Sequence, residues 1–485
     1  MINYQSRRES LSKYNAQKLK SIEDVDLLNQ SRIVDQKTNS RINNRLKTNH
    51  LVTKWFDQIE TMYDLLMHSV ENYGDLPFLG SRNRSETGDF ADYKWETYQE
   101  IYERSVNFGS GLKNCCGLSP GGDNRDFVGI FSVNNSEWVI SEKACTIFEY
   151  TLVPLYNTLG DQALRFIVGQ TEMKVVVIEG FKLLNDFYQD VLNHADYTRK
   201  TVESIVVINN NIDFADKKFE SLRSLIENLG VKIHAFSKIE NAGKTNPVIH
   251  VNKSTGNDVA MINYTSGTTG NPKGVEIMHK SIIAAATSIQ FGQQASPETC
   301  WYSYLPLPHI YERVIQAQSM MFGEKIGFFS SLKNMIEDLK LLKPTRFGGV
   351  PRVWNRFYDK IMIAKNNVDG FEHALSEKVK MVENGLITKN SEFDKYFMNF
   401  RNLLGGRVEV ASIGAAPVSA EVLNVLRAVF GIRLREGYGQ TECLIATSSS
   451  PCDHSGSIGP PGIYNEIRLI DVPEMNYFGD KGQCA

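Results

Sequence analysis

The stretch Tyr264-Thr-Ser-Gly-Thr-Thr-Gly-Asn-Pro-Lys-Gly274 is the part of the sequence from which the fold and the chemistry are inferred. Its eleven residues include three glycines, four Ser/Thr hydroxyls and one lysine, and they follow the apolar run Val259–Ile262. Glycine allows the backbone to turn with positive φ and lets its N–H groups approach an anion closely. The hydroxyls add hydrogen-bond donors, and Lys273 adds a mobile positive charge. The composition therefore predicts a loop that binds phosphate groups.

Two other interpretations of this stretch are a surface loop and a Walker A loop. A surface loop without a ligand is the plain alternative, because Ser, Thr, Gly and Pro are typical of loops. A Walker A loop does not fit, because Pro272 lies where the second glycine of that motif would fall. The density of donors and the apolar run in front of them favour phosphate binding.

A second candidate ligand-binding motif lies nearer the end of the chain, at Gly437-Tyr-Gly-Gln-Thr-Glu442. The ring of Tyr438, between two glycines, suits stacking on an aromatic base, and Thr441 offers a donor to phosphate. Glu442 offers a hard oxygen ligand to Mg²⁺. Taken alone, this motif fits an ordinary turn with a packed tyrosine equally well. Upstream, the small residues of Gly414–Ala416 would let a ligand lie directly on the backbone.

Apolar runs of strand length alternate with helical patterns along the chain, which favours an α/β fold with mostly parallel sheets. We expect strands at 127–133, 152–156, 175–178, 205–208, 275–278 and 408–412. We expect helices at 62–70, 138–148, 161–169 and 281–291, and another after a cap at Ser419. Residues 209–257 are interpreted as surface connections and short elements.

Composition and charge limit the classes of partner. The net charge of −3 gives no reason to expect nucleic acid, but residues 1–50 hold ten Lys/Arg and five Asp/Glu. This polar, basic segment is interpreted as a disordered tail. It could touch an anionic membrane surface, although a solvated leader without a role is favoured.

The cysteines and the hydropathy indicate the compartment. The seven cysteines are odd in number and include no Cys-x-x-Cys pair, which favours a reducing compartment and no structural zinc. No stretch approaches the roughly 18 apolar residues of a membrane-spanning helix, and the N-terminus lacks the apolar core of a signal peptide. We expect a soluble or peripheral protein.

The first stretch closely resembles the phosphate-binding signature of the adenylate-forming superfamily. Three further segments are similar to long-chain fatty acyl-CoA synthetases, and the resemblance covers roughly residues 55–483. These segments are Leu305-Pro-Leu-Pro-His-Ile-Tyr-Glu-Arg313, Val350-Pro-Arg-Val-Trp-Asn-Arg356, and the part of 127–160 that holds Glu137–Glu142 and Val153–Tyr156.

The resemblance implies that residues 51–485 form the large, AMP-binding N-terminal domain of the superfamily. It also implies a two-step reaction, in which a fatty acid and ATP give acyl-AMP and pyrophosphate, and CoA then displaces AMP to form a thioester. By this resemblance, Thr265, Ser266, Gly267, Thr268, Thr269, Gly270 and Lys273 hold the β- and γ-phosphates of ATP. Tyr438, next to Gly439, stacks on adenine, Thr441 binds the α-phosphate, and Glu442 binds Mg²⁺. Gly414, Ala415 and Ala416 form a wall shared by adenine and the acyl carboxylate, and His309 lies near the junction of acyl group and phosphate. Catalytic roles are expected for Thr265, Lys273, His309, Thr441 and Glu442.

The resemblance also sets limits on these expectations. In the family, a later Thr-Gly-Asp holds the ribose, and a mobile C-terminal lid domain supplies the lysine that catalyses adenylation, so Lys273 is not that lysine. Gly479-Asp480 falls too early to replace the aspartate, and we expect a truncated chain that makes little thioester from palmitate and CoA. The alternatives are an impaired module that binds ATP or fatty acid, and an enzyme that adenylates another carboxylate. The expected location is intracellular, either cytoplasmic or peripheral on the endoplasmic reticulum or peroxisomal membrane.

Overall fold

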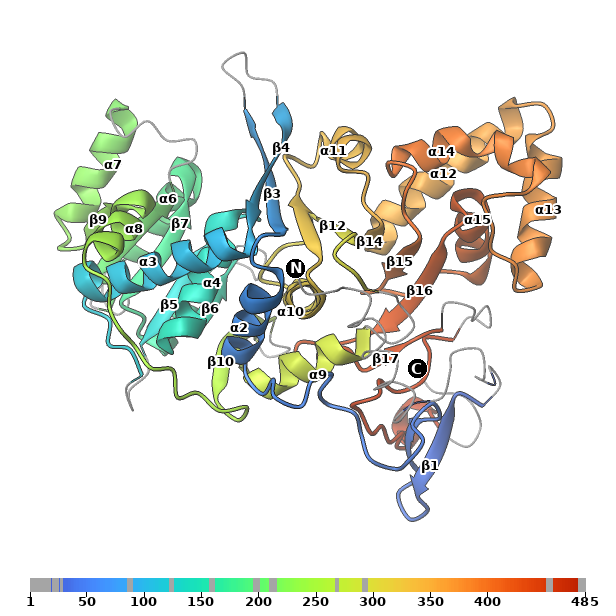
Figure 1. Cartoon of the computed structure of the whole chain (residues 1–485), viewed down its shortest axis with the longest axis horizontal. Helices are drawn as coiled ribbons and strands as arrows, with labels where there is room; N and C mark the ends of the chain where they lie inside the picture. Colours follow the sequence, from blue (N-terminus) through green and yellow to red (C-terminus); the bar gives the residue numbers. More distant parts are fainter. Residues whose placement is uncertain are drawn as a thin grey trace. The chain divides into compact units, whose positions relative to one another are not determined.

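The computed structural model describes residues 19, 26, 29–84, 90–121, 126–156, 162–194, 201–208, 216–266, 270–289, 295–450 and 457–478. The chain forms two compact units (Figure 1). Unit 1 comprises Met1–Trp55, Ala284–Gln294 and Lys343–Ala485, and unit 2 comprises Phe56–Ile283 and Ala295–Leu342. Both are α/β, with mostly parallel strands, so the predicted fold class is confirmed.

Unit 2 contains a seven-stranded sheet of order β11-β10-β6-β5-β7-β8-β9. Its strand pairs are parallel except for the antiparallel hairpin of β10 and β11. The central strands are buried along almost their whole length, which explains why they appear in the sequence as continuous apolar runs. The bounds are β5 (Phe127–Phe131), β6 (Thr151–Leu155), β7 (Val175–Glu179), β8 (Ser204–Ile208), β9 (Lys232–Ala235), β10 (Val259–Thr265) and β11 (Lys273–Met278).

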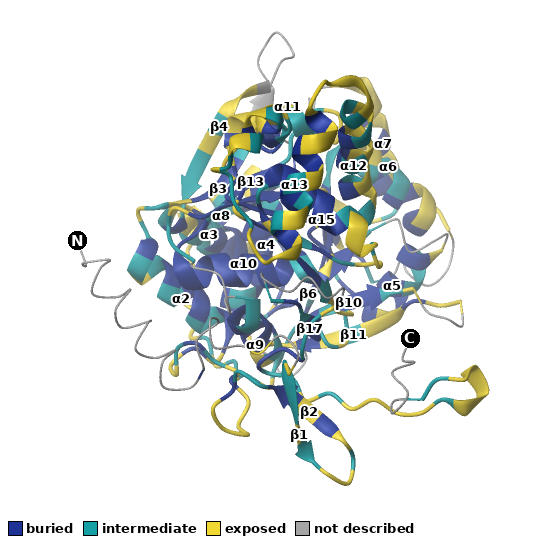
Figure 2. Ribbon diagram, turned by 90° about the vertical axis from the view of Figure 1, so that its right-hand side faces the viewer, coloured by how far each residue is buried: buried dark blue, intermediate teal, exposed yellow. Residues whose placement is uncertain are grey.

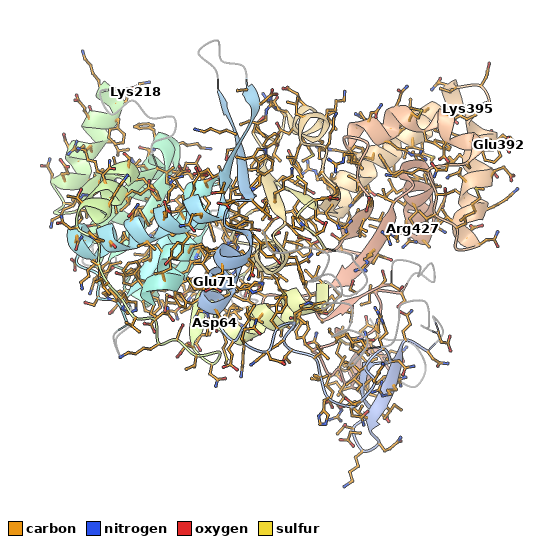
Figure 3. All side chains as sticks on the ribbon, viewed as in Figure 1. Asp64, Glu71, Lys218, Glu392, Lys395 and Arg427 are labelled. Atoms are coloured by element: carbon orange, nitrogen blue, oxygen red, sulfur yellow. The ribbon has the colours of Figure 1, made fainter. Side chains whose placement is uncertain are left out.

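Helices pack around this sheet, and several begin at caps that the sequence provides. Asn135 caps α4 by accepting the backbone N–H of Trp138. Thr61 and Asp64 form a capping box at the start of α2, where Asp64 is labelled in Figure 3. The helices are α2 (Met62–Tyr73), α3 (Tyr98–Cys116), α4 (Ser136–Phe148), α5 (Ala163–Thr171), α6 (Gly180–Phe187), α7 (Lys217–Glu227) and α8 (Phe236–Thr245).

Unit 2 also holds four strands of a second sheet, β12 (Cys300–Ser303), β13 (Lys325–Phe328), β3 (Pro77–Arg84) and β4 (Phe90–Thr97). In order β12-β13-β3-β4, the first three are parallel and β4 is antiparallel to β3. Between β12 and β13 runs α10 (Ile310–Phe322), which is buried on nearly every side, as its dark blue colour in Figure 2 shows. The short helix α11 (Met335–Leu342) follows β13, and α9 (His279–Ile289) follows β11.

In unit 1, β14 (Arg346–Gly349), β15 (Val410–Ile413) and β16 (Arg433–Tyr438) are parallel, and β17 (Thr447–Ser448) is antiparallel to β16. Ser419 caps the helix after β15, as predicted. On that helix, the buried Arg427, labelled in Figure 3, donates from Nη2 to the Leu434 carbonyl at 2.9 Å. The helices of this unit are α12 (Pro351–Asn367), α13 (Phe371–Glu383), α14 (Met398–Leu403) and α15 (Ala420–Phe430).

The prediction of a disordered tail up to residue 50 is wrong for the described residues 31–50. Strands β1 (Ser31–Asp35) and β2 (Ser40–Asn43) form an antiparallel hairpin. Ile42 and Leu46, each 1% exposed, pack against Ile463 in a small core of unit 1. The polar composition of this segment does not indicate that it is folded, because its few apolar side chains pack against a residue that is remote in sequence.

The range 209–257, interpreted as surface connections and short elements, does contain short elements, and these have buried faces. This range contains α7, β9 and α8, and α8 packs closely against α3 (Figure 1). A methyl group added at Gly243 would lie 1.8 Å from the Asn107 carbonyl oxygen, and one at Gly111 would lie 2.0 Å from the Ile239 carbonyl oxygen. Small residues at the contact let the two helices approach, and they carry little hydropathy signal.

Among the described residues, no helix has both the length and the apolar character needed to cross a membrane.

Candidate functional site

The predicted phosphate loop is the tip of an antiparallel hairpin in unit 2. Tyr264 pairs with Gly274 and Thr265 with Lys273, so the strands β10 and β11 end together at the loop. Lys273 is exposed at this end. Gly270 has a φ of 105°, which only glycine adopts readily. Thr265, Ser266, Gly270 and Lys273 therefore share one hairpin end, while Gly267, Thr268 and Thr269 lie outside the described residues.

Buried hydrogen bonds hold the base of this hairpin. Tyr264 is 2% exposed, and its hydroxyl donates to Gln170 Oε1 at 2.7 Å. The Tyr156 hydroxyl donates to the Tyr264 carbonyl at 2.6 Å. Burial raises the pKa of Tyr264 to about 12, so its hydroxyl keeps its proton at neutral pH. A methyl group on Gly274 would press on the Tyr264 ring at 3.1 Å, which gives this glycine a structural role.

His309 lies at the N-terminus of α10, directly after the loop rich in proline. Its Nδ1 accepts the backbone N–H of Tyr311 at 3.3 Å, so the imidazole caps the helix. The side chain is exposed, yet the surrounding protein still lowers its pKa by desolvation. The ring is therefore neutral at pH 7. With Nδ1 used as an acceptor, Nε2 carries the proton and can donate to a ligand oxygen.

Two asparagines that sequence reasoning did not assign to the site hold the loop before His309. Asn263 of β10 donates to the Pro308 carbonyl at 2.7 Å. Asn134, at the end of β5, accepts the Leu307 backbone N–H at 3.0 Å. The signal for Asn263 was a carboxamide within the apolar run that precedes the hydroxyl-rich loop.

In unit 1, the other two predicted segments follow neighbouring parallel strands. Ile413 pairs with Glu436, so β15 and β16 end side by side, and Gly414 lies next to Gly437. A methyl group on Gly414 would be 3.2 Å from the Gly437 carbonyl oxygen. Ala415 has a φ of 74°, which is unusual for a residue with a side chain. In open α/β sheets, ligands bind beyond the carboxyl ends of parallel strands, and this edge of unit 1 is such an end.

The turn at the end of β16 carries the residues that are predicted to bind the nucleotide and Mg²⁺. Tyr438, at the end of β16, is 44% exposed. Its carbonyl accepts the Ala446 backbone N–H at 2.9 Å, which closes the turn. Only glycine fits at position 439, where a methyl group would lie 2.1 Å from the Leu444 carbonyl oxygen. Thr441 is partly exposed and Glu442 is exposed on this turn.

The residue types at this turn fit magnesium shared with a nucleotide. Among the described residues, no group of three or more His, Cys, Asp and Glu side chains could enclose a metal ion. Mg²⁺ in phosphoryl-transfer enzymes is usually held by one or two carboxylates together with water and substrate phosphates. The exposed Glu442 supplies one such carboxylate.

The predicted residues thus form two groups, one in each unit. The hairpin residues and His309 belong to unit 2, whereas Gly414–Ala416 and Tyr438–Glu442 belong to unit 1. That both groups bind one nucleotide stays a prediction.

Comparison with known proteins gives the family. The family model described as AMP-binding enzyme matches residues 66–483, which is most of the chain. The chain belongs to this family. The chain is 35% identical to peroxisomal long chain acyl-CoA synthetase 7 of Arabidopsis thaliana over 444 residues, covering 89% of this chain and 60% of the relative. It is also 35% identical to long-chain-fatty-acid–CoA ligase 5 of Rattus norvegicus over 465 residues, covering 94% of this chain and 65% of the relative.

Solved structures support the fold of this AMP-binding enzyme. The A domain of a carboxylic acid reductase from Segniliparus rugosus, in complex with AMP and a carboxylic acid, superimposes with a TM-score of 0.66 at 21% identity, covering 86% of this chain and 65% of that chain. The adenylation domain of a carboxylate reductase from Mycobacterium chelonae gives a TM-score of 0.66 at 20% identity, covering 99% and 68%. The chain spans 60 to 65% of the length of the curated relatives named above.

Proposed function

We propose that this AMP-binding enzyme represents a long-chain fatty acid–CoA ligase. In the proposed reaction, a fatty acid carboxylate oxygen attacks the α-phosphorus of ATP, and the bond to pyrophosphate breaks. The CoA thiol then attacks the acyl carbon of the mixed anhydride, and AMP leaves. The carboxylate must be activated before the thiol can attack it, because a free carboxylate repels nucleophiles and has a poor leaving group. The mixed anhydride has a good leaving group, AMP.

One observation carries the proposal. Within unit 2, the strand that leads into the phosphate hairpin is bonded to the loop that carries His309, through Asn263 and Pro308. A buried hydrogen bond therefore joins the strand of the predicted phosphate-binding hairpin to the loop of His309, the residue predicted to lie near the acyl carboxylate. An enzyme that joins a carboxylate to a phosphate needs this proximity.

The residues of unit 2 supply charge and donors. Phosphoryl and adenylyl transfer depend mainly on positioning and on neutralising developing charge. Lys273 and the hydroxyls of Thr265 and Ser266 would neutralise and hold the β- and γ-phosphates. His309, neutral with its proton on Nε2, would donate to an oxygen where acyl group and α-phosphate meet.

The residues of unit 1 would bind the adenylate part of ATP. The exposed ring of Tyr438 would stack on adenine, and the Thr441 hydroxyl would donate to the α-phosphate. Gly414, Ala415 and Ala416, which carry little side chain, would let the ligand lie on the backbone. Glu442 would hold Mg²⁺, which supplies charge neutralisation at the phosphates when bound.

The long-chain substrate rests on the relatives at 35% identity and on the Leu305–Arg313 and Val350–Arg356 segments. Burial of an acyl chain contributes about 0.8 kcal/mol per methylene. A dozen methylenes would contribute on the order of 10 kcal/mol before ordering costs, so an apolar site would strongly favour long acids.

A second candidate function is a module that binds ATP or fatty acid with little turnover. It needs only binding groups, such as the exposed Lys273 at the hairpin end and the exposed Tyr438 in unit 1. Adenylation of a different carboxylate is disfavoured by the two segments named above.

The test is pyrophosphate release by the chain with ATP and Mg²⁺, with palmitate, acetate or no acid, alongside calorimetric titration with ATP. Release that requires palmitate and is not supported by acetate is the expected result for the ligase. ATP binding without release identifies the binding module. A chain that binds neither ATP nor palmitate, each titrated by calorimetry, contradicts both functions.

A further inference from the structure

Asn263 is a polar residue in an apolar setting. It is 3% exposed in β10, between the buried Met261 and the hairpin end at Thr265. Burying a carboxamide costs free energy unless its donors and acceptor are bonded. Its Nδ2 donates to the Pro308 carbonyl at 2.7 Å, but its Oδ1 is buried without a hydrogen-bond partner among the described residues. A leucine here would avoid that cost, so the asparagine is not explained by stability.

The segment that Asn263 holds leads to His309. Residues 304–309 connect β12 with α10, and two prolines remove backbone donors from it. Asn134 also anchors this part of the chain, by donating to Ser303 Oγ at 3.0 Å and to the Leu305 carbonyl at 2.8 Å, and by accepting the Leu307 N–H. Two carboxamides therefore bind the loop, one within β10 and one shortly after β5.

The two anchors differ in what they connect. Asn134 follows β5, which is not part of the hairpin, whereas Asn263 lies two residues before Thr265 on the hairpin strand itself. A displacement of the end of β10 therefore acts directly on Pro308. Pro308 is bonded covalently to His309, whose carbonyl in turn accepts the Glu312 backbone N–H at 3.0 Å in the first turn of α10.

We propose that Asn263 is a positioning residue that sets His309 relative to the phosphate hairpin and couples the two when nucleotide binds. It does not touch the substrate in this assignment. Its side-chain amide fixes the position of the His309 loop relative to the end of β10. The coupling part of this assignment rests on the proposed function, whereas the positioning part does not.

The experiment is hydrogen–deuterium exchange of the whole chain, read in the peptide that covers residues 304–309, with Asn263→Leu as the main variant. Asn263→Ala is the second variant, in case the leucine does not fit. Asn424→Leu is the matched control, because Asn424 is likewise a buried asparagine with a side-chain hydrogen bond, which in its case is accepted from Arg427 Nη1 at 3.1 Å in α15. Circular dichroism checks that each variant is folded.

Without nucleotide, we expect exchange in 304–309 to rise about tenfold in the Asn263 variants, as follows from the loss of one buried hydrogen bond. The control should leave exchange in this peptide unchanged. Unchanged exchange in a folded Asn263 variant would overturn the positioning role, whether or not ATP binds.

With ATP and Mg²⁺, we expect exchange in 304–309 to slow in the unmodified chain and in Asn424→Leu. In Asn263→Leu, ATP should still bind by calorimetry, but the slowing in 304–309 should be lost. Full slowing in that variant would overturn the coupling. If the unmodified chain binds no ATP, the proposed function and the coupling fail together, while the nucleotide-free measurement still decides whether Asn263 positions the loop.

Discussion

Thr265 lies directly opposite Lys273 across the β10–β11 hairpin. This pairing brings the first hydroxyl of the glycine-rich stretch and its lysine to the same end of two hydrogen-bonded strands. Between the strands, Gly270 has a φ of 105°, a backbone conformation that favours glycine. A phosphate group at this end would meet a hydroxyl and an ammonium group whose backbones are already fixed.

Lys273→Ala should lower ATP affinity at least about tenfold, because it removes the cation expected to neutralise the phosphates. The side chain is exposed, so the free energy of unfolding should change by less than about 0.5 kcal/mol. Calorimetric titration and thermal unfolding measure the two quantities. Lys253→Ala, at another exposed lysine, is the control and should leave ATP affinity unchanged. Equal affinities for the two variants would contradict the role of Lys273.

Glu442→Gln should weaken the Mg²⁺ dependence of ATP binding, because the neutral amide is a poor ligand for this hard cation. The measurement is ATP affinity over a series of Mg²⁺ concentrations. We expect the curve to shift to higher Mg²⁺ by about tenfold or more. Glu466→Gln, at an exposed glutamate, should reproduce the curve of the unmodified chain. If Glu442→Gln does the same, the metal is not held there.

Gly439→Ala should destabilise the turn that carries Tyr438, because the new methyl group would lie 2.1 Å from the Leu444 carbonyl oxygen. Backbone atoms cannot give way as a flexible side chain can, so a loss of about 1–3 kcal/mol is expected. Gly256→Ala is the control, with its nearest neighbours at 3.3 Å. Denaturant unfolding compares the two, and equal stabilities would show that the turn adapts at no cost.

Glu312 should make stability depend on pH. Burial raises the pKa of this carboxyl to about 7, although Ser303 donates to it and Arg313 lies nearby. Between about pH 4.5 and 7, the folded chain therefore holds a proton that the unfolded chain releases. The free energy of unfolding therefore falls as the pH rises from about 4.5 through 7. The stabilisation lost over this range is on the order of 3 kcal/mol.

Glu312→Gln removes this titration while keeping an acceptor for Ser303. Relative to the unmodified chain, the variant should gain stability from pH 5 to pH 8, as measured by denaturant unfolding at both values. Glu383→Gln, at an exposed position, should follow the unmodified chain at each pH. A constant difference between Glu312→Gln and the unmodified chain would show that Glu312 does not titrate in this window.

Much of the fold could be predicted from local patterns. Strands β5, β6, β7 and β8 are buried and parallel, so each appears as a short apolar run, and caps such as Asn135 and Ser419 mark where helices begin. The β1–β2 hairpin could not be found in this way. Its core residues Ile42 and Leu46 stand in a polar segment, and their partner Ile463 is remote in sequence.

The sequence predicts the parts of the site in which several functional residues are neighbours in the chain. It does not predict single residues that contact these parts from other segments. The hairpin and the Tyr438 turn combine glycines with polar side chains within a few positions, which ordinary strands do not. Gln170 and Tyr156 each contact the hairpin at Tyr264 through one hydrogen bond, and Asn263 contacts the His309 loop through one. A single polar residue in an apolar run gives no indication of which carbonyl or hydroxyl it will meet.

The N-terminal hairpin of unit 1 has a consequence for biosynthesis. The Asn43 side chain donates to the Pro461 carbonyl at 2.8 Å, from a position 418 residues earlier in the chain. A ribosome delivers Asn43 long before Pro461, and the whole of unit 2 is translated in between. The β1–β2 hairpin therefore remains without this partner until residues around Pro461 have emerged, and unit 2 can complete its folding in that time.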